Sequence, residues 1–179
     1  MNDYGELLDE RTVRFERLLQ GPVERVWRYL IESEKRALWL CAGDVEPRAG
    51  GRVDMHFNNQ SLSSDDDIPR PEKYADIPVP LSFNGTVTAW EPCRLLTHTW
   101  EFGGEVSEVS YELTEMGDKV RLVLTHRRLE TADTVLSVSG GWHTHLNILV
   151  DVLEGGRVRP FFKMQTALEA EYSRRLGLG

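Results

Sequence analysis

The sequence has few cysteines and little positive charge, and each scarcity excludes a class of protein. Only two of its 179 residues are cysteines, Cys41 and Cys93. Neither has a partner at C-x-x-C spacing, which argues against a disulfide scaffold or a structural zinc site and favours two reduced thiols. The formal net charge of -8 argues against a general nucleic-acid binder, because such proteins need a basic surface to neutralise phosphates.

Signals for membranes and export are also missing. The sequence has no run of about eighteen apolar residues, so we expect no membrane span and no membrane partner. The first stretch, MNDYGELLDERTVRFERLL, lacks the basic and then apolar regions of a secretory signal. We therefore expect a cytoplasmic location. The length and the 40% of hydrophobic residues predict one domain, residues 1–179, with a sizeable core.

Motifs with a known chemistry are absent as well. There is no G-x-S-x-G elbow, no G-x-x-x-x-G-K-[ST] loop and no G-x-G-x-x-G after a predicted strand. The acidic run at residues 65–67 lacks the ligand spacing and the trailing glutamate of a calcium loop, which favours a solvated loop. The sequence therefore predicts no cofactor and no metal.

Hydrophobic periodicity predicts a mixture of strands and helices. Alternation predicts strands over 12–19 and 51–58, and apolar residues three or four apart predict a helix that begins near Pro22. A second short helix is predicted from Ser33, as a candidate cap, to about Leu40. Four strand-like segments follow: SFNGTVTAWEP, RLLTHTWEF, EVSEVSYELTE and KVRLVLTHRRLE. The short breaks between them predict an antiparallel meander.

The remaining segments complete the predicted architecture. A long helix is predicted over 134–153, ended by two glycines at 155–156, and an extra helix over 160–176 that packs on the same chain. The polar, proline-rich stretch 58–81 is predicted to be an inserted loop, mobile in part, that forms a lid or a subunit contact. This order predicts an α+β fold in which an antiparallel sheet carries helices on one face. A curved sheet that grips the long helix would leave a cavity between the two.

Side chains alternate between the two faces of a strand. The residues that face this cavity can therefore be predicted, if the more apolar side of each strand points toward the long helix. The predicted aromatic wall is Phe57, Phe83, Trp100, Tyr111 and Trp142. Three histidines fall beside it: His98, His126 and His145. By contrast, His143 falls off the helix stripe and is predicted to be peripheral. The glycines at 140–141 are predicted to let the helix approach the sheet closely.

Three histidines beside an aromatic wall allow several interpretations. They could form a three-histidine metal site, or supply a general base that enolises a bound carbonyl compound. They could instead be polar contacts to a ligand, or half-buried structural residues. Because no compact pattern such as H-E-x-x-H is present, we favour ligand contacts or structure and assign no catalytic and no metal-binding residue.

Several linked motifs in order resemble a known family. The stretches are PVERVWRYLI, LWL, GDVEPRAGGRVDMHF, NGTVTAWEPCRLLTHTW, SEVSYELTEMGDKVRLVLTHRRL and GGWHTHLNILVDVLEG, between about residues 12 and 172. They resemble the SRPBCC superfamily, and more narrowly the family of the C-terminal domain of the heat-shock-protein-90 ATPase activator. The resemblance implies a helix-grip fold, also called START-like or birch-pollen-allergen-like, in which a curved antiparallel sheet wraps a long C-terminal helix and two short helices close one end.

The resemblance also implies a function. Members bind lipids, sterols, polyketides or other apolar molecules, some are cyclases or hydrolases, and a few act on chaperones. We therefore expect a small hydrophobic or amphipathic ligand, bound by the aromatic wall and the three histidines. Two alternatives stay open: a chaperone-regulating interaction protein, and a cyclase- or hydrolase-type enzyme that uses the cavity histidines. A homodimer is a further expected partner, whereas a chaperone is less expected, because the animal and fungal activators depend on a further N-terminal domain.

Overall fold

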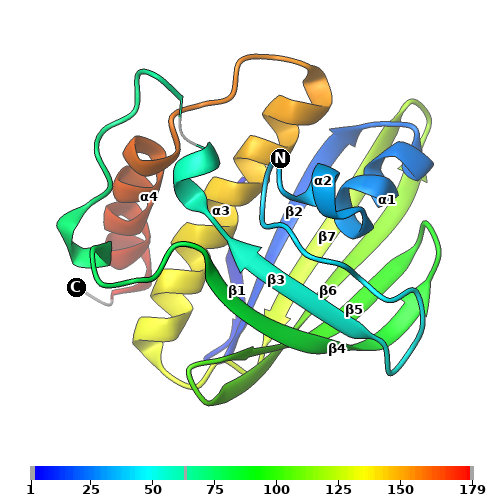
Figure 1. Ribbon diagram of the computed structural model, residues 1–179, viewed down its shortest axis with the longest axis horizontal. Helices are drawn as coiled ribbons and strands as arrows, with labels where there is room; N and C mark the ends of the chain where they lie inside the picture. Colours follow the sequence, from blue (N-terminus) through cyan, green and yellow to red (C-terminus); the bar gives the residue numbers. More distant parts are fainter. Residues whose placement is uncertain (1–2, 63, 178–179) are drawn as a thin grey trace.

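The computed structural model describes residues 3–62 and 64–177, and its centre is an antiparallel sheet curved around a long helix (Figure 1). The seven strands pair in the order β1-β2-β7-β6-β5-β4-β3. Their bounds are β1 Glu6–Asp9, β2 Thr12–Gln20, β3 Arg52–Phe57, β4 Leu81–Glu91, β5 Leu95–Phe102, β6 Glu105–Met116 and β7 Lys119–Arg127. All neighbouring strands are antiparallel, as the short connections predicted.

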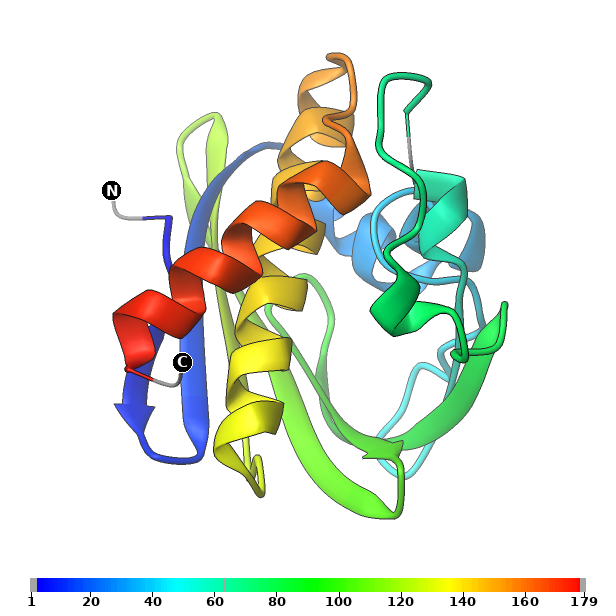
Figure 2. The ribbon, with the colours of Figure 1, turned by 90° about the vertical axis from the view of Figure 1, so that its left-hand side faces the viewer.

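The helices lie in two groups. The short helices α1 (Val23–Ile31) and α2 (Ser33–Arg36) lie together at one end of the sheet. The long helix α3 (Ala132–Glu154) crosses the concave face, and α4 (Phe161–Leu176) packs on α3 (Figure 2). Two single 3-10 turns, η1 (Asn59–Leu62) and η2 (Glu72–Tyr74), lie in the segment between β3 and β4. The predicted helix-grip architecture is therefore confirmed, and α4 packs on its own chain as expected.

Apart from the exposed strand β1, the strands form where β-branched and aromatic residues alternate with polar ones, and their apolar side is buried on the inner face of the sheet. On β6 and β7 the fully buried positions include Val109, Tyr111, Leu122 and Leu124. Tyr111 lies directly opposite Leu124 across the two strands, so these side chains share the inner face. The face assignment made from period two is therefore correct along the middle of the sheet.

Helix α3 is buried on two sides rather than one. Every residue from 142 to 149 is buried, because the sheet covers one side of the helix and α4 covers the other. The helix begins at Thr131, whose side chain accepts a hydrogen bond from the Thr134 amide at 3.1 Å. It ends at Gly155, whose φ of 68° is left-handed and suits a residue without a side chain. The predicted glycine stop is confirmed.

Three details differ from the sequence-based expectations. Strand β1 was not predicted, and its four residues are all exposed, which explains why it carries no alternating pattern. Helix α2 ends at Arg36 rather than near residue 40. Ser33 does not cap α2; its hydroxyl accepts a hydrogen bond from the Gly43 amide at 2.9 Å and so holds the following loop. The serine that the sequence offered as a helix cap therefore binds an amide ten residues later in the chain instead.

Candidate ligand cavity between the sheet, α3 and the 64–81 segment

A cavity of about 270 Å³ opens between the inner face of the sheet, α3, α4 and the segment that precedes β4. The sheet and the turn after α2 contribute Leu40, Phe57, Leu81, Phe83, Trp100, Phe102 and His126. The helices contribute Ser137, Val138, Gly141, Trp142, His145, Phe162 and Gln165. The segment before β4 contributes Asn59, Gln60, Arg70, Tyr74, Ile77, Pro78 and Val79. The site is therefore built from parts of the chain that are far apart in sequence.

Six of the eight predicted contact residues line this cavity: Phe57, Phe83, Trp100, His126, Trp142 and His145. The other two, His98 and Tyr111, are on the inner face as predicted but do not line it. They lie farther along the strands, where their rings stack at 5.9 Å and core residues close over them. Period two gives the side of a sheet on which a residue lies, and it gives no information on whether the space opposite is filled.

The aromatic wall is continuous. The rings of Phe57 and Phe83 stack almost in parallel, with centroids 5.5 Å apart and an interplanar angle of 10°. Phe83 contacts Trp100 at 5.2 Å, and Trp100 contacts Trp142 of α3 at 5.5 Å in an edge-to-face arrangement. Such pairs hold large apolar rings in fixed positions. The wall therefore offers flat apolar surface on the sheet side and on the helix side of the same cavity.

His126 is a structural residue at the cavity wall. The Trp142 Nε1–H donates to His126 Nδ1 at 3.0 Å, so this nitrogen carries no proton. The Nε2–H then donates to the Ser107 hydroxyl at 2.7 Å. Burial lowers the pKa of His126 to about 3, with His98 as a smaller cause, so the ring is neutral at neutral pH. Both ring nitrogens are occupied within the protein, which leaves His126 no hydrogen bond for a ligand.

His145 differs from His126 in this respect. Its Nδ1 lies 2.7 Å from the Trp39 carbonyl oxygen, which only accepts, so Nδ1 holds the proton and donates. Burial lowers the pKa of His145 to about 4, with the bond to Trp39 opposing the shift. In the neutral ring Nε2 is a lone-pair acceptor; the bond at Nδ1 is the one that His145 makes among the described residues, and Nε2 is not one of the fully buried atoms without a partner. The ring lines the cavity, between Phe57 at 6.2 Å and Phe161 at 5.1 Å.

The other two histidines of interest lie outside the cavity lining. His98 Nδ1 donates to the Thr99 carbonyl at 2.8 Å, and burial lowers the pKa of His98 to about 4. His143 was predicted to be peripheral to the cavity, and it does lie outside the lining, but it is buried, with only 4% of it exposed. It lies beneath α4, where its Nδ1 is 3.0 Å from the Tyr172 hydroxyl. The burial of His143 was missed because an apolar stripe on a helix marks one covered side, whereas α4 covers a second side of α3.

Residues 64–81, called the cover segment below, close one side of the cavity and are fixed to α4. The Asp67 carboxylate accepts hydrogen bonds from the Phe162 and Lys163 amides, both at 2.8 Å, and so caps the first turn of α4. Farther along, Lys73 and the Tyr74 hydroxyl both contact the Glu169 carboxylate of α4. The acidic run is therefore not simply a solvated loop.

The two glycines before Trp142 face different neighbours. A side chain at Gly140 would lie 2.9 Å from Glu169 Cγ, so this glycine lets α4 approach α3. The expected role, a close approach of α3 to the sheet, is not the role of Gly140. A side chain at Gly141 would meet no atom within 4 Å, because this glycine faces the cavity. One glycine therefore serves packing between helices, and the other leaves space in the cavity.

Residues 58–81 were predicted to form a lid or a subunit contact, but the sequence named none of their lining residues, and it missed the contribution of α4. Arg70, Ile77 and Val79 lie in a stretch without periodicity, so no local pattern marks them as cavity residues. Phe162 was recognised as an apolar position of the last helix, but its place at the cavity depends on how α4 crosses α3. Among the residues that the structure describes, no three metal-binding side chains come together, and no helix is long and apolar enough to cross a membrane.

Comparison with known proteins shows which family this chain belongs to. The family described as "Activator of Hsp90 ATPase homolog 1-like protein" matches residues 79–154, which carry the meander and α3. The protein encoded by gene BPP1335 of Bordetella parapertussis is 40% identical, with a TM-score of 0.81 over 97% of this chain and 91% of that one. This chain belongs to the AHSA1-like family. A comparison with curated proteins finds no significant match.

More distant solved structures share the fold alone. EF2215 of Enterococcus faecalis, described as a conserved protein of unknown function, is 17% identical, with a TM-score of 0.70 over 98% of this chain and 90% of that one. CalU16 of Micromonospora echinospora is 20% identical, with a TM-score of 0.66 over 91% of this chain and 86% of that one. The START-like helix-grip fold of this family member is therefore established, as its sequence motifs implied.

Proposed function

We propose that this AHSA1-like protein binds a small, largely apolar molecule in the cavity between the sheet and α3, as a cytoplasmic binding protein. One observation carries the proposal: a volume of about 270 Å³ is walled by stacked aromatic rings. Ligand sites in proteins are typically concave and apolar, with a few placed polar groups. Core side chains that merely fill space would leave no such volume in a well-packed interior.

The rim of the cavity supports the same function. Three of the large apolar side chains that remain exposed lie along it: Ile77 at 39%, Val79 at 45% and Phe102 at 48%. Ile77 and Val79 belong to the cover segment, and Phe102 ends β5. Exposed apolar groups gathered around one opening commonly mark a binding site. They would let an apolar molecule exchange water for protein contacts before it enters.

Gly141 offers a direct test. Gly141→Leu adds a side chain that meets no protein atom at its Cβ and projects toward the cavity. We expect this variant to fold and to lose affinity for apolar probes by at least about tenfold, measured by quenching of tryptophan fluorescence and by native mass spectrometry. Ala167→Leu, at an exposed position of α4, is the matched control and should bind as the wild type does. Equal binding by both variants, or no binding by the wild type across a broad apolar library, would refute the proposal.

The alternative functions receive less support. An enzyme that uses the cavity histidines would need a base, but His126 has both nitrogens occupied and His145 has a pKa of about 4, which makes it a weak base at neutral pH. Regulation of a chaperone rests on the family description alone. Stimulation of a chaperone ATPase by the purified protein would support that role, and a homodimer is tested by the mass in solution.

A further inference from the structure

We propose that the ligand is anchored by a neutral hydrogen-bond donor, a phenol or another hydroxyl on a flat apolar body, which donates to Nε2 of His145. This inference rests on the proposed function, because it concerns the polar end of the molecule in the same cavity. It rests on a comparison of the polar groups that line the cavity: how buried each group is, and which of its hydrogen bonds are already made within the protein.

Most polar residues of the lining lie where water can reach them. Gln60 and Ser137 are exposed, and Arg70 and Gln165 are half-buried. At such a position a hydrogen bond to the ligand only replaces one to water, so it selects a ligand weakly. Asn59 is also half-buried, but its Oδ1 is fully buried without a partner among the described residues, which makes it a second acceptor among the lining residues. By contrast, two polar residues of the lining are fully buried, His126 and His145, at 1% and 6% exposure.

The two buried histidines have opposite capacities. The hydrogen bonds of His126 are both used, by Trp142 and by Ser107. His145 uses only Nδ1, as a donor to the Trp39 carbonyl oxygen, and this bond fixes the tautomer. Nε2 is therefore an acceptor in a ring that cannot turn over without losing the Trp39 bond. Nε2 is not one of the fully buried atoms without a partner, so it is accessible from the cavity that the ring lines, and a donor on the ligand can take the place of water there.

The charge of the site narrows the class of ligand further. Because His145 is neutral, it offers a lone pair and no positive charge, so a carboxylate or phosphate would meet an acceptor instead of a donor. The arginine of the lining, Arg70, is half-buried, and its Nη2 already donates to the carbonyl oxygens of Tyr74 and Ile77. An anion placed deep in the cavity would lose its hydration without gaining a cation. The geometry therefore favours a phenol-like donor over an acid.

Three fused-ring probes separate the possibilities on the unmodified protein: 2-naphthol, 2-methoxynaphthalene and 2-naphthoate. They share the apolar body and place a donor, an acceptor or an anion at one position. We expect 2-naphthol to bind about 3- to 10-fold more tightly than 2-methoxynaphthalene, the range for one net hydrogen bond, and 2-naphthoate to bind most weakly. Titration calorimetry at pH 7.5 gives the three affinities.

Two variants assign the preference to His145. In His145→Asn the amide nitrogen takes the place of Nδ1 and keeps the donor to Trp39, while the Nε2 acceptor is removed. His145→Gln keeps an acceptor near the position of Nε2. We expect His145→Asn to bind the naphthol and the methyl ether equally, and His145→Gln to retain part of the preference.

The outcomes are distinct. If none of the probes binds, the proposed function itself fails. If the naphthol and the ether bind the wild type equally well, the cavity is a binding site and the donor inference is overturned. Tighter binding of 2-naphthoate would also overturn it, since Arg70 at the rim would then be the anchor. A preference for naphthol that His145→Asn retains would assign the contact to another residue and contradict the role of Nε2.

Discussion

At the scale of single residues, the partners of a polar side chain decide its role more than its identity does. The four buried histidines of this protein are alike in burial and in lowered pKa. They differ in which nitrogens are occupied: His126 has two partners inside the protein, and His145 has one. A histidine is therefore available to a ligand only where a nitrogen remains without a partner and faces a space.

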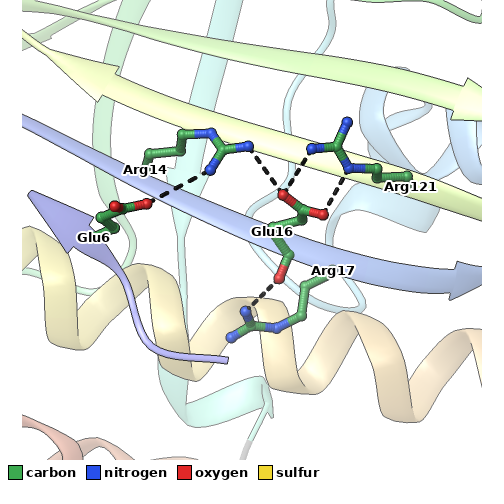
Figure 3. A network of polar contacts seen from close by, with 5 residues as sticks. All are labelled: Glu6, Arg14, Glu16, Arg17 and Arg121. Atoms are coloured by element: carbon green, nitrogen blue, oxygen red, sulfur yellow. Dashed lines mark hydrogen bonds and ion pairs between the residues drawn. The ribbon is translucent and has the colours of Figure 1, made fainter. Parts of the chain in front are cut away.

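Arg17 is a second residue whose partners matter (Figure 3). On the outer face of the sheet, the Glu16 carboxylate accepts hydrogen bonds from Arg121 at 2.6 and 2.8 Å and from Arg14 at 2.9 Å, and this pairing with Arg121 lowers the pKa of Glu16. Arg17 points to the inner side and is only 3% exposed. Its Nη1 donates to the Glu16 carbonyl oxygen, but Nε and Nη2 have no partner among the described residues.

We predict that Arg17→Met stabilises the protein. Burial is the main cause that lowers the pKa of the Arg17 guanidinium, with the charge of Asp3 opposing it, so the folded state holds a poorly compensated charge. An apolar side chain of similar length should raise the free energy of unfolding by about 1 kcal/mol or more, measured by urea denaturation. Arg14→Met on the outer face is the control and should change it by about 0.5 kcal/mol or less. A loss of stability specific to Arg17→Met would show that the guanidinium has a partner.

At the scale of elements, the cover segment and α4 behave as one structural unit. Asp67 holds the amino end of α4, and Glu169 in the middle of α4 holds Lys73 and Tyr74. Arg157, just before α4, adds an ion pair with Asp66 at 3.0 Å. Because both parts line the cavity, the shape of the site depends on contacts between two elements that have little regular backbone pairing with the sheet.

We predict that Asp67→Ala destabilises α4 and loosens the cover segment. The substitution leaves the Phe162 and Lys163 amides without their acceptor, and loss of a helix cap typically costs about 1 kcal/mol. Amide hydrogen exchange should accelerate at both residues and in η2, while the centre of β6 stays protected. Asp65→Ala, at an exposed position two residues earlier, is the matched control. Identical exchange in both variants would contradict the coupling.

At the scale of the whole molecule, the buried histidines make stability depend on pH. Burial lowers the pKa of His98, His143 and His145 to about 4 and of His126 to about 3, from a usual value of 6.5. Above pH 6.5 these rings are neutral in both the folded and the unfolded chain, so they contribute no pH dependence. Below it the unfolded chain takes up protons that the folded protein excludes, and stability falls.

We therefore predict a loss of stability as the pH falls from 6.5 to about 4.5, before carboxylates with a lowered pKa such as Glu16 contribute. Each histidine adds a slope of up to about 1.4 kcal/mol per pH unit. Urea denaturation at pH 7.5, 6.5, 5.5 and 4.5 measures the slope, and His143→Gln should reduce it by up to one such increment. A free energy of unfolding that stays constant over this range would contradict the expected burial of neutral histidines.

The sequence by itself determined the class of fold and which face of each strand and helix is buried. Alternation along β6 and β7 and the apolar stripe of α1 are local patterns, because a side chain's direction follows from backbone geometry within a few residues. Val26, Trp27 and Leu30 of α1 are buried as their spacing predicted. Six of the eight predicted contact residues reached the cavity for the same reason.

Only the tertiary structure decided where the cavity lies and which of its lining histidines has a free nitrogen. A void depends on how distant segments close over a surface, and here the cover segment and α4 close over Phe83 and Trp142 but not over Tyr111. The single bond that orients His145 comes from Trp39, 106 residues earlier in the chain. Local periodicity carries no information about contacts of that separation. The sequence therefore named three histidines, of which two line the cavity and one, His145, keeps a nitrogen available there.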